Sequence, residues 1–224
     1  MTRFAASLIA LLVALPGAVL AQTVPGQAKA EGDALIAGAR AGDLFDNLSE
    51  ADGGAIRLRH KASGLVCVFN AGDAANKLLV FDSATRGDEI ACSTGGEAGE
   101  RTLYLTRAPG RTLAQAFTQD VAEVEKSHPG WAPYDLPKGI DSPQLQMLAT
   151  PPMPASRTAR FIVDHTFTSV SSAMVKDWAL EYRFTCPEEQ QDAAAGTLQP
   201  TLWASILAQM SGAPLDLIAP KEAV

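Results

Sequence analysis

The sequence has few of the residues that most often carry enzyme chemistry. Its histidines and cysteines number three each: His60, His128, His165, Cys67, Cys92 and Cys186. They form none of the His-Glu-x-x-His, His-x-His or Cys-x-x-Cys patterns that are typical of zinc sites. The Gly-x-Ser-x-Gly and Ser-x-x-Lys motifs of serine hydrolases are missing as well, and so are the glycine-rich loops that bind nucleotides. The sequence therefore predicts no catalytic residue, no metal site and no cofactor.

Basic runs and long apolar segments are also missing. The chain has 18 basic against 25 acidic residues, which gives a net charge of −7, and no run of basic residues interrupts this acidic balance. Nucleic-acid binding depends on contacts between basic side chains and phosphates, so we expect no nucleic-acid partner. The apolar run Ala5–Leu15 is shorter than the roughly 20 residues that a membrane-spanning helix needs. We therefore expect no stable membrane anchor.

That apolar run belongs to a segment, residues 1–21, with the three-part layout of a secretory signal peptide. A basic start, the apolar run, a helix breaker and small residues near the cleavage point follow one another: Arg3, Ala5–Leu15, Pro16 and Gly17, Val19 and Ala21. Gln22 stands where a lipoprotein would need a cysteine. The sequence thus predicts cleavage near Ala21 and a soluble periplasmic or secreted product. Its net charge would be −8, because 17 basic and 25 acidic residues remain.

After cleavage we expect one folded domain with short flanking segments. Residues 22–32 consist mainly of Gly, Ala, Gln and Lys and are predicted to be a flexible leader. Residues 33–213 are expected to form a single α+β domain, and residues 214–224, with few core-forming side chains, a tail. The nearest candidate for a linker is the Pro-rich loop from Gly130 to Pro143, which is too short to separate two cores.

The order of elements predicts an antiparallel sheet covered by helices, the α+β class. Apolar alternation predicts five strands in a meander: Ile56–His60, Leu65–Phe69, Lys77–Phe81, Glu89–Cys92 and Thr102–Thr106. Three later strands are expected at Gln144–Ala149, Ala159–Thr168 and Trp178–Cys186. Two main amphipathic helices are expected at Leu113–Lys126 and Leu198–Met210, and short helical turns at Ala34–Leu48. The meander and the later strands are expected to share one sheet.

Two of the three cysteines can pair in an oxidising compartment. Cys67 and Cys92 lie in the second and fourth strands of the meander, and a bond between them would close a loop of 26 residues. We therefore predict a Cys67–Cys92 disulfide and a buried free thiol at Cys186. Connectivity does not follow from sequence alone, so pairings of Cys186 with either of the other two stay open.

The histidines and Cys186 are interpreted as structural residues. Alternation places His165 on the apolar face of the strand Ala159–Thr168, and His60 likewise shares a face with apolar neighbours. His128 lies in the loop that ends a helix, where we expect it to be solvated. Cys186 points into an apolar strand face, with His165 expected on the adjacent strand. Because burial raises a thiol pKa and lowers its reactivity, a catalytic Cys–His pair is not expected.

The last third of the chain resembles a known group of domains. The segments ARFIVDHT and VKDWALEYRFTCPEE, followed by an amphipathic helix, resemble the end of Mog1/PsbP-like domains. The resemblance implies an extended strand pair and a final helix on an antiparallel sheet. Since that group consists largely of binding and assembly proteins, it implies no catalytic residues. The stretch RLRHKASGLVCVF is similar to a segment of uncharacterised secreted proteins from Gram-negative bacteria, which implies no activity.

We therefore expect a non-catalytic binding or envelope-associated protein, which holds a protein or a small molecule on its sheet or in a cleft between sheet and helix. The alternative is a hydrolase of envelope material, with a site assembled from distant loops by residues such as Tyr134, Asp135 and His128. A closed pocket in which a histidine meets a Ser, Asp or Cys would favour the enzyme. A shallow apolar or acidic groove would favour binding.

Overall fold

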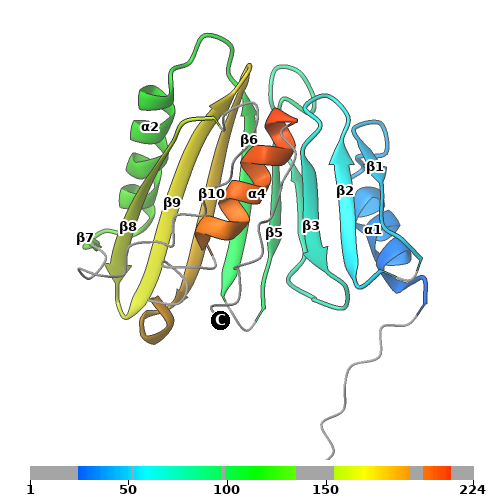
Figure 1. The fold of residues 1–224 in the computed structure, drawn as a ribbon, viewed down its shortest axis with the longest axis horizontal. Helices are drawn as coiled ribbons and strands as arrows, with labels where there is room; N and C mark the ends of the chain where they lie inside the picture. Colours follow the sequence, from blue (N-terminus) through cyan, green and yellow to red (C-terminus); the bar gives the residue numbers. More distant parts are fainter. Residues whose placement is uncertain (1–24, 52, 97–98, 135–153, 192–198, 213–224) are drawn as a thin grey trace, which may run out of the picture.

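A computed structural model describes residues 25–51, 53–96, 99–134, 154–191 and 199–212. In these ranges the chain forms two antiparallel sheets, of three and seven strands, together with three α-helices (Figure 1). The expected α+β class is confirmed. The signal segment, the expected strand Gln144–Ala149, Asp135 and the tail 214–224 lie outside the described residues.

The three-stranded sheet contains β1, β2 and β3 in that order: Phe45–Asn47, Ala55–His60 and Val66–Asn70. One face of this sheet belongs to the core, since Ile56, Leu58 and His60 of β2 are fully buried there. The arginines between them are exposed on the other face. Helix α1, Gln27–Gly38, packs against β1 and β2 (Figure 1). Of the segment Ala34–Leu48, for which helical turns were expected, only the part up to Gly38 is helical, as the end of α1. The strand β1 lies in the rest of it.

Helix α1 begins at Gln27, inside the segment 22–32 for which the sequence predicts a flexible leader. From Gln27 on, that prediction is wrong. The helix approaches β1 closely, since a Cβ added to Gly32 would lie 2.7 Å from Nδ2 of Asn47. This Nδ2 donates a hydrogen bond to the main-chain oxygen of Lys29 at 2.8 Å. The small residues that resemble a leader are therefore what lets β1 approach the helix.

The seven-stranded sheet has the order β4-β5-β6-β10-β9-β8-β7, with every neighbouring pair antiparallel. Its strands in chain order are Lys77–Val80, Glu89–Thr94, Glu100–Arg107, Ala132–Pro133, Ser156–Val163, Thr166–Val175 and Trp178–Pro187, and a 3-10 turn, η1, follows at Glu188–Gln190. The meander is split between two sheets, so the prediction of one shared sheet is wrong. The break follows Asn70, where Gly72 has φ 82° and the Asn76 side chain donates to the Asn70 oxygen at 2.6 Å. These contacts turn the chain away from β3 before β4 begins.

A disulfide joins the two sheets near this break. Cys67 of β3 and Cys92 of β5 are bonded, with their Cα atoms 6.0 Å apart, which confirms the predicted pair. Cys186 is free and buried, as expected. The bond therefore ties two separate sheets together, whereas the sequence suggested a bond within one sheet.

The expected strand Ala159–Thr168 is in fact parts of two strands, β8 and β9, joined by a tight turn. Asp164 and His165 lie between the strands with φ 44° and 60°. Two successive residues with positive φ form the turn type that closes two-residue hairpins. His165 therefore leaves the sheet: its side chain is 95% exposed, and the prediction of a core histidine is wrong.

Two helices cover opposite faces of the seven-stranded sheet. Helix α2, Leu113–Ser127, packs on one face through Val124. Helix α4, Gln199–Ser211, covers the other face, where the ring of Trp203 stacks on that of Tyr182 with centroids 6.0 Å apart. Figure 1 shows α4 crossing in front of the sheet near β10 and β6. Both helices agree with the sequence prediction.

Candidate functional site

His60 takes part in a histidine–serine contact, but the contact is structural. Its Nδ1 lies 2.9 Å from Oγ of Ser63, and the same Oγ accepts the N–H of Leu65 at 3.1 Å. The rings of Phe45 and Trp178 pack against the imidazole, with centroids 5.1 and 5.6 Å away. Burial lowers the pKa of His60, which favours the neutral ring. The pair closes the turn between β2 and β3, and His60 is buried as expected, although its Nε2 has no hydrogen-bond partner in the described structure.

His165 and Cys186 border one shallow hollow at the end of β10 without forming a catalytic pair. Nδ1 of His165 lies 3.0 Å from a carboxylate oxygen of Glu188, so the ring is oriented toward that carboxylate. Cys186 is 2% exposed, and burial raises the pKa of its thiol. The backbone of Gly99 covers it so closely that an added Cβ would lie 3.0 Å from the Cys186 Cβ. The reactive thiolate is therefore disfavoured.

The described residues of the hydrolase alternative do not converge on a pocket. His128 caps the C-terminal end of α2 and is exposed, as expected. The ring of Tyr134 packs edge to face on Phe167, with centroids 5.6 Å apart. In the described ranges, no group of three or more His, Cys, Asp or Glu side chains is arranged to hold a metal ion.

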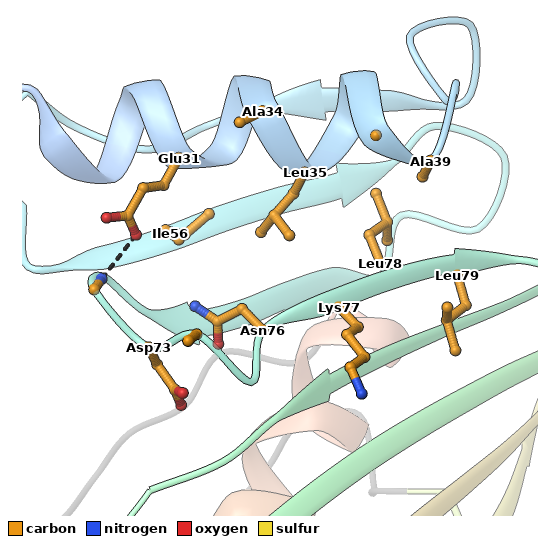
Figure 2. Close-up of a pocket in the computed structure, with 13 residues that line it drawn as sticks. Glu31, Ala34, Leu35, Ala39, Ile56, Asp73, Asn76, Lys77, Leu78 and Leu79 are labelled. Atoms are coloured by element: carbon orange, nitrogen blue, oxygen red, sulfur yellow. Dashed lines mark hydrogen bonds between the residues drawn. The ribbon is translucent and has the colours of Figure 1, made fainter.

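An open apolar groove runs between α1 and β4 (Figure 2). Its volume is about 500 Å³, and its walls include Leu35 and Ala39 of α1, Ile56 of β2 and Leu78 of β4. Figure 2 shows Leu35 and Leu78 turned toward one another across it. Hollows of this size and apolar character are typical of ligand sites. We call this feature the α1–β4 groove.

The strand at this groove, β4, is an edge strand, since among the strands of the described ranges it pairs only with β5. The N–H of Phe81 donates to the main-chain oxygen of Glu89 at 3.0 Å, and this bond sets the direction of the ladder. In an antiparallel pair the groups alternate, so Leu79 turns its N–H and C=O toward β5, whereas Leu78 and Val80 turn theirs away. Helix α1 contacts β4, and Figure 2 shows it running above the strand. An edge strand with free main-chain groups is a template for another strand.

The carboxylates at the rim of the groove are held by main-chain donors. The Glu31 carboxylate accepts the N–H of Gly72 at 2.7 Å (Figure 2). The Asp73 carboxylate accepts the N–H of Ala75 at 2.8 Å. Lys77 is exposed, and Figure 2 shows its side chain pointing away from α1. The interior of the α1–β4 groove therefore stays apolar, and Figure 2 shows both carboxylates at one end of it.

A hollow of a different character lies between α2 and its face of the seven-stranded sheet. Its volume is about 390 Å³, and its lining includes Asp120 and Glu123 of α2, Glu181 of β10 and Tyr104 of β6. Asp120 and Glu181 are each 8% exposed. Buried carboxylates in a hollow are uncommon because removing a charge from water costs free energy. We call this feature the carboxylate cleft.

The buried carboxylates of the cleft are hard to ionise. Burial raises the pKa of Glu181 to about 7, although the hydrogen bond from Arg183 opposes the shift. Burial also raises the pKa of Asp120, against the hydrogen bond that Oγ of Ser172 donates to it. Arg183 reaches Glu123 as well, at 3.0 Å. The cleft is thus ordered by its own contacts, and Glu181 exchanges its proton near neutral pH.

No family model matches the chain. No curated protein sequence is significantly similar to it either. The Mog1/PsbP-like resemblance of the last third therefore stays a prediction. Among the helices of the described ranges, none has both the length and the apolar composition that crossing a bilayer requires.

Sequence reasoning missed both buried carboxylates, although Asp120 had a signal. Asp120 lies four residues after Ala116 and four before Val124, so it occupies the apolar stripe of α2. An acidic residue in that position is unusual enough to mark a buried polar site. Glu181 had no such signal, because the alternation of its strand places it on the polar face together with Arg183.

Proposed function

We propose that this protein is a non-catalytic binding protein that takes up an extended segment of a partner polypeptide in the α1–β4 groove. The observation that carries the proposal is the free main-chain edge of β4 beside an apolar groove. Strand addition uses main-chain hydrogen bonds for affinity and alternate side-chain contacts for selectivity. Leu78 and Val80 would supply the hydrogen bonds, and Leu35 and Ala39 the apolar contacts.

The composition of the groove supports binding over catalysis. Among the described residues that line it there is no histidine, cysteine or serine. The carboxylates of Glu31 and Asp73 accept main-chain hydrogen bonds and are thereby occupied. An open apolar groove is the arrangement expected of a binding protein and not of a hydrolase.

The groove can be tested with a fluorescein-labelled hexapeptide of alternating valine and threonine. We expect saturable binding by fluorescence polarisation. Replacing Ala34, which lines the groove, by tryptophan should weaken it at least about tenfold by filling the space. Ala37→Trp is the matched control, since Ala37 is also exposed on the same helix but is not among the residues that line the groove.

A second peptide tests whether main-chain pairing is used. Methylating the alternate amide nitrogens that face β4 removes donors without changing the side chains. Two lost hydrogen bonds of about 1 kcal/mol each should weaken binding by about tenfold or more. Equal binding of the methylated peptide, or equal effects of Ala34→Trp and Ala37→Trp, would contradict strand addition in this groove.

We also propose that the protein works outside the cytoplasm after removal of residues 1–21. The Cys67–Cys92 disulfide supports this, because such bonds persist in oxidising compartments. Intact-mass analysis of protein from the culture medium or periplasm should give a chain that begins at Gln22. Exported material that still carries Met1 would count against it.

A further inference from the structure

A separate hollow lies where α4 meets β3 and the seven-stranded sheet. Its volume is about 320 Å³, and it is largely apolar, with Leu103 of β6, Leu202 and Ile206 of α4 and the Cys67–Cys92 disulfide in its walls. We call it the α4 groove. It lies on the opposite face of the sheet from the carboxylate cleft, since Leu103 belongs to the main core and Tyr104 to the other face.

The charges of the α4 groove are all of one sign. Among the described residues that line it, Arg57 and Arg101 carry a charge, and none is an aspartate or glutamate. In the described structure, neither guanidinium forms an ion pair or a hydrogen bond. Other arginines, Arg59, Arg86, Arg107 and Arg183, are each paired with a carboxylate. In a chain of net charge −7, two unpaired arginines in one hollow form a local site for an anion.

Tyr182 adds a buried hydroxyl to this wall. The residue lines the groove and is 3% exposed, and its Oη has no hydrogen-bond partner in the described structure. Burial raises the pKa of Tyr182, and the nearby charge of Arg101 opposes that shift, which places the two groups within electrostatic reach. Buried hydroxyls nearly always have a partner. An anionic oxygen in the groove would accept this hydrogen bond next to a guanidinium.

The walls of the groove are held in place by bonds across it. The N–H of Val66 on β3 donates to Oε1 of Gln209 on α4 at 3.1 Å, and the disulfide joins β3 to β5. Tyr182 is held by its stacking on Trp203. A site whose walls are already ordered loses little conformational entropy when a ligand binds.

We propose that the α4 groove binds an amphiphilic carboxylate, with the carboxylate between Arg101 and the Tyr182 hydroxyl and the apolar tail along Leu103, Leu202 and Ile206. The site is distinct from the α1–β4 groove and does not depend on it. Arg101 makes the direct contact with the carboxylate, because it lies on the same face of β6 as Leu103. Arg57 contributes a second positive charge to the groove. A guanidinium and a hydroxyl together satisfy both oxygens of a carboxylate.

The test is a titration of the folded mature protein with decanoate below its micelle concentration. Binding is measured by isothermal titration calorimetry. We expect one decanoate per chain. Acetate, which has only the head, and decyltrimethylammonium, which has the same tail with a cationic head, should not bind at the same concentrations. Arg101→Gln should weaken decanoate binding at least about tenfold, because a hydrogen bond to a charged group is lost. Tyr182→Phe, which keeps the ring, should weaken it several-fold.

Two matched variants give the controls. Arg59→Gln removes an arginine from the neighbouring outward position of β2 that is paired with Asp46, and it should leave decanoate binding unchanged. Ala34→Trp, which fills the α1–β4 groove, should also leave it unchanged. The proposal is overturned if decanoate does not bind, if the cation binds equally well, if acetate alone suffices, or if Arg101→Gln and Arg59→Gln behave alike in variants with unaltered melting temperature.

Discussion

Replacing Cys67 and Cys92 together by alanine should lower the free energy of unfolding by about 3.5 kcal/mol. The two residues are 25 positions apart, and in the chain-entropy model a loop of this length restricts the unfolded chain by about that amount. For a domain stable by about 5 to 15 kcal/mol this is a large share. Because the bond also joins the two sheets, its loss should be visible in the cooperativity of unfolding. Urea denaturation followed by tryptophan fluorescence measures both.

The control for the disulfide is the third cysteine. Cys186→Ala removes a buried thiol that makes no cross-link, so its cost should be only that of a small cavity, about 1 kcal/mol. A reductant should lower the urea midpoint of the unaltered protein and leave that of the double variant unchanged. If Cys186→Ala cost as much as the double replacement, or if reduction had no effect, the stabilising role of the bond would be refuted.

Raising the pH from 4.5 to 8 should cost the unaltered protein about 3 kcal/mol of stability relative to a Glu181→Gln variant. The pKa of Glu181 in the folded state is about 7, above its usual value of 4.5, so the folded state binds this proton more tightly than the unfolded chain does. Its contribution is therefore fully present below pH 4.5 and is lost as the pH rises through 7. A tenfold change in proton affinity is worth about 1.4 kcal/mol, which sets the size of the effect.

Chemical denaturation of both proteins at several pH values measures this difference. Glu123→Gln is the matched control, because Glu123 contacts the same Arg183 but is half exposed, with 51% of its side chain accessible. Its removal should change the pH dependence little, since exposed ion pairs contribute about 1 kcal/mol or less. Parallel pH curves for the unaltered protein and Glu181→Gln would show that the pKa of Glu181 is the same in the folded and unfolded chain, contrary to this account.

The helices and strands that are determined by residues close together in the sequence could be predicted from it. Helix α2 is an example, because its apolar stripe is local and Thr112 and Gln115 form a capping box, in which the Thr112 hydroxyl accepts the Gln115 N–H at 3.2 Å. The meander strands follow from alternation, which has a period of two. The Asp164–His165 turn escaped this reading, since it contains no glycine and the alternation continues across it.

The sequence by itself determined the α+β class, most of the strands, both main helices and the cysteines able to pair. Only the tertiary structure decided that the meander divides into two sheets, that β4 has an open edge, and that Glu181 and Asp120 share a cleft. The physical reason is that strand neighbours and buried charges depend on contacts between residues far apart in the chain. Alternation shows which side chains share a face, but not what that face meets. The two grooves proposed as binding sites are of this second kind, since each is formed by elements that only the fold brings together.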